Sequence, residues 1–325
     1  MPRRPQPLPP QLSDDVTPIG LWPQLGVSVE RARRTDVTRP FRGVVAAGFA
    51  TDDLVSSAVA LTARRHMPPF GFSHQTAAHL LGLPLPSDID HRTLHVTVAH
   101  PARAPRLVGV SGHAYRLGPQ SFQLQPVTVG GIHEERYLPV LDDGLLFATL
   151  ASALRLDDLV AVADALRWRA SRARKPCDLA HALTPGRIGS DRGRRALALS
   201  VDGVRSRPES LLRLILARAG LPTPTIGHVI TGSSWSATPD LAWPQFHVLV
   251  EYEGDHHRTS ERQFSHDIRR FDRYADQGWS AVRAVKADVF DDPRELVGRI
   301  ARRLRGGGWR PHKRWQPGRA RPAHR

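Results

Sequence analysis

Hydrophobic and polar positions alternate along the chain with two different periods, which predicts a multidomain α/β protein. Apolar residues recur at helical spacing from Leu54 to Arg65 and from Asp157 to Arg167, and a third helix is predicted from Gln75 to Leu81. Leu94 to Val98 alternates as a strand does. The uninterrupted apolar run Val248 to Val250 is typical of a strand buried in a parallel sheet.

Changes in this pattern divide the chain into six expected segments. The first segment, residues 1–12, is rich in proline and is expected to be disordered. Thr17 and Ser28 can cap two short helices, so residues 13–48 predict a helix, a turn, a helix and a strand. The others are a mixed α/β domain at 49–166, a basic helical connector at 167–195, an α/β domain with a central mixed sheet at 196–305, and a basic disordered tail at 306–325.

The charge of the chain indicates a polyanionic partner. Lys and Arg number 46 against 31 Asp and Glu, which gives a formal net charge of +15. Cys177 is the only cysteine, so a disulfide within the chain and a cysteine-based zinc site are excluded, and a reducing cytoplasm fits. No run approaches ~20 apolar residues and the first residues lack an apolar signal sequence, so neither a membrane span nor secretion is expected.

Basic residues concentrate in three places. Arg31, Arg34 and Arg42 would form one face of the first module, and this face either contacts DNA or is solvated while the module packs on the next domain. The connector at 167–195 is either a solvated linker or a hinge that contacts DNA. The acid-free tail is suited to non-specific binding of nucleic acid.

Three carboxylates meet at the ends of two predicted strands. Asp240 precedes the first strand, and Glu251 and Glu253 lie two apart on the second, so they share a face. Clustered acids repel each other unless a hard cation lies between them, and carboxylate oxygens suit Mg²⁺ or Mn²⁺. In a strongly basic chain, such a site favours phosphodiester chemistry on nucleic acid.

The order Pro-Asp, then Glu-x-Glu-Gly, resembles the PD-(D/E)xK nuclease superfamily. The C-terminal part is more narrowly similar to the group related to very-short-patch-repair endonucleases, over roughly residues 196 to 305. The resemblance rests on an ordered set of motifs: Pro239–Asp240, Glu251–Gly254, Gly254–His257, Asp267–Arg270, Gly278–Arg283 and the helix start Arg207–Ser210. It implies a restriction-endonuclease-like fold.

The same resemblance implies roles for particular residues. Asp240 and Glu251 would hold Mg²⁺ or Mn²⁺, and Glu209 would reach the ion through water. Glu253 stands where the superfamily usually has lysine, so Glu253 or His257 would take a proton from the attacking water.

Two further residues complete this implied site. Arg270 would bind a phosphate of the nucleic acid, and Asp267 would orient His257 or Arg270.

The N-terminal part resembles AbiEi-type antitoxins of abortive-infection systems. Residues 17–47 are similar to the winged-helix unit at the start of that group, and Ser73–Leu83 is similar to a segment of its second domain. Within that segment we interpret His74 as structural, and we find no nucleophile–base pair in residues 49–166.

Two functions of different classes follow. The first is a cytoplasmic, metal-dependent DNA endonuclease that acts in DNA repair or in defence against phages and mobile elements. The alternative is a DNA-binding regulator or antitoxin with an inactive nuclease fold, which Glu253 in place of lysine favours. A nuclease directed at RNA stays open, because the sequence does not distinguish the two polyanions.

Overall fold

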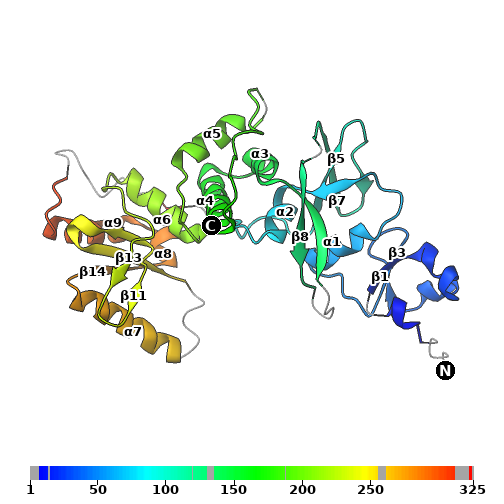
Figure 1. Cartoon of the computed structure of the whole chain (residues 1–325), viewed down its shortest axis with the longest axis horizontal. Coiled ribbons are helices and arrows are strands. Elements are labelled where there is room, and N and C mark those ends of the chain that lie inside the picture. Colours follow the sequence, from blue (N-terminus) through cyan, green and yellow to red (C-terminus); the bar gives the residue numbers. More distant parts are fainter. Residues whose placement is uncertain are drawn as a thin grey trace. The chain divides into compact units, whose positions relative to one another are not determined.

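The computed structural model describes residues 7–13, 15–118, 120–129, 135–186, 188–254, 261–311 and 322–323, with only the backbone for 261–268 (Figure 1). The chain forms two compact units. One comprises Met1–Leu83 and Ile89–Ala153, and the other comprises Pro84–Asp88 and Leu154–Arg325. The multidomain α/β prediction is confirmed at this level. None of the described helices is both long and apolar enough to cross a membrane.

The first module is a small antiparallel sheet rather than a helix–turn–helix. Its strands β1 (Asp15–Pro18), β3 (Val44–Ala47) and β2 (Val37–Thr38) pair in the order β1-β3-β2. The helices expected after Thr17 and Ser28 are short 3-10 turns, η2 (Ile19–Leu21), η3 (Pro23–Leu25) and η4 (Val29–Arg33). Pro18, Pro23 and the left-handed Gly26 limit η2 and η3 to three residues each, and the helix expected after Ser28 is a 3-10 segment of five residues, which corrects the prediction.

Residues before 13 already contribute to the core of the first module. The 3-10 helix η1 (Pro10–Leu12) places Leu12 in a cluster with Trp22, and both side chains are fully buried. The disorder expected for residues 1–12 therefore does not extend to residues 10–12, because Leu12 supplies apolar surface to the module's core.

A six-stranded mixed sheet forms the centre of the N-terminal unit, in the order β6-β7-β5-β4-β9-β8. Its strands are β4 (Phe70–Phe72), β5 (Leu94–Ala99), β6 (Arg106–Leu107), β7 (Val110–Tyr115), β8 (Phe122–Val127) and β9 (Arg136–Leu141). The α-helices that the structure describes in this unit are α1 (Leu54–Thr62), α2 (His74–Leu80) and α3 (Asp143–Ala153). The predicted helices near 54 and 75 and the strand at 94 are thereby confirmed.

Three helices open the C-terminal unit: α4 (Leu156–Ala173), α5 (Ser190–Leu199) and α6 (Arg207–Arg218). Asp164 of α4, almost fully buried, accepts hydrogen bonds from Ser210 and Arg213 of α6 at 2.8 and 3.0 Å and from the Val201 amide at 2.7 Å. This network fixes α4 to α6. Helix α4 therefore packs with the C-terminal unit, whereas the sequence grouped its first half with the preceding domain.

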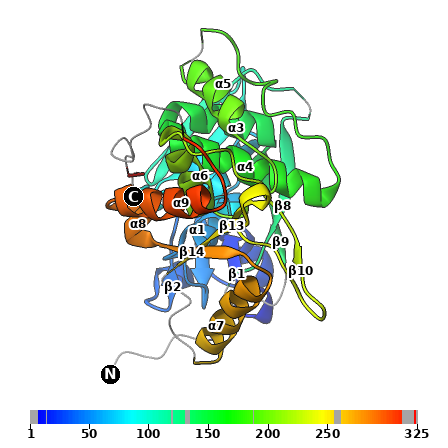
Figure 2. The same ribbon diagram turned by 90° about the vertical axis from the view of Figure 1, so that its left-hand side faces the viewer.

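A three-stranded mixed sheet carries the predicted carboxylates. β12 (Leu241–Trp243) pairs antiparallel with β13 (Val248–Glu253), which pairs parallel with β14 (Ser280–Val285). Helix α7 (Glu261–Asp276) connects the parallel strands and covers one face of the sheet (Figure 2). On this face Ala242, Leu249 and Tyr274 belong to one buried hydrophobic cluster.

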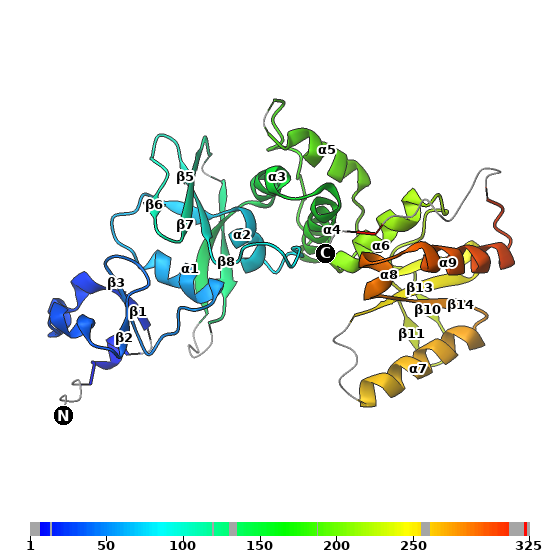
Figure 3. The same ribbon diagram turned by 180° about the vertical axis from the view of Figure 1, so that it is seen from behind.

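The other face of this sheet packs on α6, α8 (Lys286–Phe290) and α9 (Arg294–Gly306) (Figure 3). A short hairpin, β10 (Ile230–Thr231) and β11 (Ser236–Ala237), lies before β12. In the segment expected to be a disordered tail, Ala323 is buried in the same core, and its amide donates to the Val289 carbonyl at 2.9 Å.

Candidate functional site

The strand register brings Asp240 and Glu251 together. Leu241 pairs with Val250, so the next pair outward along these antiparallel strands is Asp240 with Glu251. The Oδ2 atom of Asp240 accepts a hydrogen bond of 2.7 Å from the Tyr252 amide, and the Asp240 amide hydrogen-bonds the Glu251 carboxylate. The two predicted metal ligands are therefore neighbours, fixed by each other's backbone.

Glu251 is a buried carboxylate whose described partners only partly offset the cost of burying its charge. Its side chain is 5% exposed, Tyr274 donates a hydrogen bond of 2.7 Å to Oε1, and an Arg270 nitrogen lies 3.7 Å from the same atom. Burial and the Asp240 carboxylate raise its pKa to about 7, against the smaller opposing effects of Arg270 and Tyr274. The site thus holds a carboxyl group that ionises only at a free-energy cost unless a cation is bound.

Glu209 is a second acid whose ionisation is disfavoured by burial and by the charge of Asp240. It lies in the first turn of α6, where it accepts hydrogen bonds from Ser206 Oγ at 2.8 Å and from the Arg205 amide at 3.1 Å. Burial, and then the Asp240 carboxylate, raise its pKa to about 7. Asp240 is the common neighbour of both acids, which fits the predicted place of Glu209 near the ion.

The donor set suits a hard cation held by few protein ligands. Oxygen atoms are what Mg²⁺ prefers, and Mg²⁺ usually keeps several waters while one or two carboxylates bind it. Among the described residues, no three carboxylates bring their oxygen atoms within 4.8 Å of one another, so the acids alone do not surround an ion. The group that does meet this distance consists of His74, His95 and His113 in the N-terminal unit. Asp240 and Glu251 can therefore hold such an ion with water completing its shell.

Glu253 forms an ion pair with Arg283 on the neighbouring strand β14. Its Oε1 lies 3.2 Å from Nε of Arg283 on β14, and Arg283 pairs in register with Glu251. The Arg283 guanidinium also lies over the Phe271 ring of α7, at 4.1 Å from its centre. The predicted proton acceptor is thus partly neutralised by an ion pair.

The structure describes only some of the remaining predicted residues, and these differ in burial and in pairing. His257 lies outside the described residues, as does the side chain of Asp267, although its backbone belongs to α7. Arg31 is bound by both guanidinium nitrogens to Asp36, at 2.8 and 2.6 Å, and is mostly buried. Arg34 and Arg42 are exposed.

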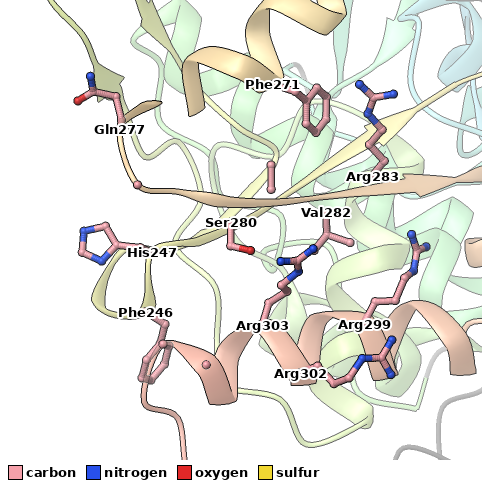
Figure 4. Close-up of a pocket in the computed structure, with 14 residues that line it drawn as sticks. Phe246, His247, Phe271, Gln277, Ser280, Val282, Arg283, Arg299, Arg302 and Arg303 are labelled. Atoms are coloured by element: carbon pink, nitrogen blue, oxygen red, sulfur yellow. The ribbon is translucent and has the colours of Figure 1, made fainter. Parts of the chain in front are cut away.

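An arginine-lined groove that the sequence reasoning missed runs along β14. It has a volume of about 1100 Å³ and lies between α7 and α9. Figure 4 shows Arg299, Arg302 and Arg303 on α9 on one side of the strand, with Phe271 and Arg283 on the other. Arg302 and Arg303 follow Arg299 by three and four residues on α9, so the three side chains lie near one another on the helix surface. This spacing is the signal in the sequence that could have identified the basic face.

Charge is not fully neutralised in this groove. Arg299 pairs with Asp288 at 3.2 Å and Arg283 pairs with Glu253. Within the part of the chain that the structure describes, Arg302 and Arg303 have no carboxylate within ion-pair distance. The groove, which we call the arginine groove, therefore presents net positive charge to solvent.

The comparisons with known proteins add no activity. No protein-family model matches the chain. Two similar proteins of Mycobacterium tuberculosis are "Uncharacterized protein MT2308" (strain CDC 1551 / Oshkosh) and "Uncharacterized protein Rv2248" (strain ATCC 25618 / H37Rv), each 31% identical over 158 residues. The match covers 48% of this chain and 58% of each relative, so the chain spans little more than half the length of the curated relatives it matches.

Proposed function

We propose that the C-terminal unit is a metal-dependent DNA endonuclease with a restriction-endonuclease-like fold, in which Asp240 and Glu251 hold Mg²⁺ or Mn²⁺. The observation that supports it most is the pairing of these acids: Glu251 is buried beside Asp240, and its pKa is raised to about 7. Such an arrangement is unfavourable for folding alone and is relieved by a cation. When bound, the ion would polarise the scissile phosphate and lower the pKa of a water molecule.

The residues of the chain supply positioning and positive charge. The Tyr252 amide fixes Asp240, and Tyr274 fixes Glu251, so both carboxylates keep their orientation. Arg270 beside Glu251 and Arg283 beside Glu253 bring guanidinium groups from α7 and β14 to a site whose usual lysine is replaced by Glu253. We assign Arg270 a contact with the substrate phosphate once the ion neutralises Glu251.

The arginine groove supports nucleic acid as the substrate. Arg302 and Arg303 line this groove and would contact phosphates, which would orient a strand without reading its sequence. The exposed Arg34 and Arg42 of the first module would add a second contact, in line with the proposed AbiEi-like role of the N-terminal unit in positioning the protein on DNA.

One observation favours the alternative of a DNA-binding regulator or antitoxin without catalysis. The ion pair between Glu253 and Arg283 occupies the place where catalysis in the superfamily uses a free lysine. In that case the basic surfaces bind DNA and the carboxylates no longer serve hydrolysis.

The test compares cleavage by the parent and by Asp240→Asn, with Asp276→Asn on the exposed end of α7 as the matched control. Each protein is incubated with supercoiled plasmid, linear DNA and structured RNA, with Mg²⁺, with Mn²⁺ or with a chelator. Metal-dependent cleavage by the parent and the control but not by Asp240→Asn supports the proposal. Equal cleavage by Asp240→Asn contradicts it, and tight DNA binding without cleavage selects the regulator.

A further inference from the structure

Three histidines converge in the N-terminal unit, whereas the carboxylates belong to the C-terminal unit. His74 is the first residue of α2, His95 lies in β5 and His113 lies in β7. One ring nitrogen of each lies within 4.8 Å of the others. His95 Nδ1 and His113 Nε2 are 3.1 Å apart, and the His74 ring stacks on the His113 ring with their centres 4.0 Å apart.

The sheet fixes two of these side chains on one face. β5 and β7 pair in parallel, and Thr97 is the register partner of His113. Residues two apart on a strand share a face, so His95, Thr97 and His113 all project to the same side. Because the strands form the centre of the unit, the separation of His95 and His113 is set by the backbone.

His74 is held over this pair at a conformational cost. Its φ of 50° lies in the left-handed region, which side-chain-bearing residues adopt rarely. Its Nδ1 lies 3.0 Å from Ser73 Oγ, and its side chain is buried. Ser73, the N-cap residue of α2, makes no capping hydrogen bond with its hydroxyl, which instead lies against the His74 ring.

A buried polar atom on the same face has no partner. Thr97 is fully buried, and its Oγ1 forms no hydrogen bond among the described residues. An orphaned buried hydroxyl costs free energy and usually marks a missing water or ion. This observation is independent of the histidines.

The nitrogen spacing matches the separation of two ligands on one tetrahedral ion. With metal–nitrogen bonds of ~2.0–2.1 Å, tetrahedral geometry places ligand nitrogens ~3.3 Å apart. His95 and His113 are already close to this distance, and the third imidazole completes a three-histidine donor set. Water in a fourth position could bond to Thr97.

We propose that His74, His95 and His113 form a binding site for Zn²⁺ or a similar borderline transition-metal ion. Imidazole nitrogen is the donor such ions prefer, whereas Mg²⁺ prefers oxygen. The site joins α2 to β5 and β7 and leaves one coordination position for solvent or a small ligand.

The protonation of the rings agrees with this site. Burial lowers the pKa of both His95 and His113, and His95 lowers that of His113 further. Both imidazoles are therefore neutral near pH 7, which is the form that ligates a metal.

The experiment measures metal content and affinity in the untagged full chain. The protein is stripped with a chelator and titrated with Zn²⁺ by calorimetry, and with Co²⁺ by visible absorption, which reports the coordination number. His95→Gln and His113→Gln each remove one ligand while keeping a polar side chain. The controls are His79→Gln, an exposed histidine of α2, and Asp240→Asn in the carboxylate site.

We expect the parent to bind one equivalent of Zn²⁺ and its Co²⁺ form to show a spectrum of nitrogen ligation. The affinity for Zn²⁺ should weaken by more than about 100-fold in His95→Gln and in His113→Gln, which exceeds the loss typical of outer-shell partners. Both controls should bind as the parent does. The proposal is overturned if the parent binds no Zn²⁺, or if folded His113→Gln, verified by circular dichroism, binds it with unchanged affinity. Loss of the same equivalent in Asp240→Asn would place the ion at the carboxylates instead.

Discussion

The Oδ2 atom of Asp240 lies 2.7 Å from the Tyr252 nitrogen, so the carboxylate before β12 is fixed against β13 beside Glu251. The hydrogen bond compensates only one of the charges gathered there. Glu209 and Glu251 both feel the Asp240 carboxylate. Ionisation of this cluster therefore couples the stability of the C-terminal unit to pH and to cations.

Stability of the metal-free protein should fall as pH rises from about 4.5 to about 7. The pKa values of Glu209 and Glu251 are raised from 4.5 to about 7, so the folded state binds more protons than the unfolded state in this window. Each carboxyl should remove roughly 3 kcal/mol across it. Urea unfolding in a chelator at several pH values measures the loss, and Mg²⁺ should restore stability at pH 8. A flat profile would show that the acids are not mutually destabilised.

Asp240→Asn should stabilise the metal-free protein at pH 8 by about 1 kcal/mol, because one negative charge is removed while the amide oxygen can still accept from Tyr252. The same variant should lose the stabilisation by Mg²⁺. Asp276→Asn removes an equal charge at an exposed position and should do neither. If Asp240→Asn destabilises the protein, the carboxylate is structural.

DNA affinity should decrease steeply with salt, and Arg302→Gln or Arg303→Gln should each reduce the slope of log K against log[salt] by about 0.9. The reason is that each arginine of the arginine groove would release one condensed counterion. Arg294→Gln, on the same helix but paired with Asp292 at 2.6 Å, removes the same charge and should leave the slope unchanged. Fluorescence anisotropy at several salt concentrations measures these slopes. Equal slopes for all three variants would exclude the groove as the binding surface.

Asp164→Ala should destabilise the C-terminal unit by about 3–5 kcal/mol, because it leaves Arg213 as a buried, unpaired charge. The Ser210 hydroxyl and the Val201 amide would also lose their acceptor. Chemical denaturation gives the change. Asp191→Ala breaks the exposed pair with Arg194 and serves as the control, which should unfold at the same denaturant concentration as the parent.

Elements that are specified by residues close together in the sequence, such as an apolar run or a helix-capping pattern, could be predicted. The apolar run before Glu251, and the helix start at Ser206 with Glu209 three residues later, each specify local structure through burial or capping. The pairing of Asp240 with Glu251 follows because only a short turn joins their strands. These parts of the fold and site depend on neighbours close in sequence.

Other features depend on contacts that local pattern does not contain. His74, interpreted from its sequence as structural, meets His95 and His113 only because β5 and β7 pair in parallel and α2 begins beside them. The arginine groove likewise needs β14 and α9 in their folded positions. The two 3-10 turns that replace the expected helix after Thr17 reflect the positions of Pro18, Pro23 and Gly26, which outweigh helix capping.

The outer edge of β14 has consequences for association between molecules. In the three-stranded sheet β14 has only β13 as a neighbour, so its other edge carries peptide groups that no described strand pairs. An unpaired edge is a template for a strand from another chain, and charged side chains beside it discourage such pairing. The positive charges of Arg283, Arg299, Arg302 and Arg303 lie beside this edge. We expect them to disfavour pairing with the same edge of a second molecule, whereas they would attract the polyanion proposed above.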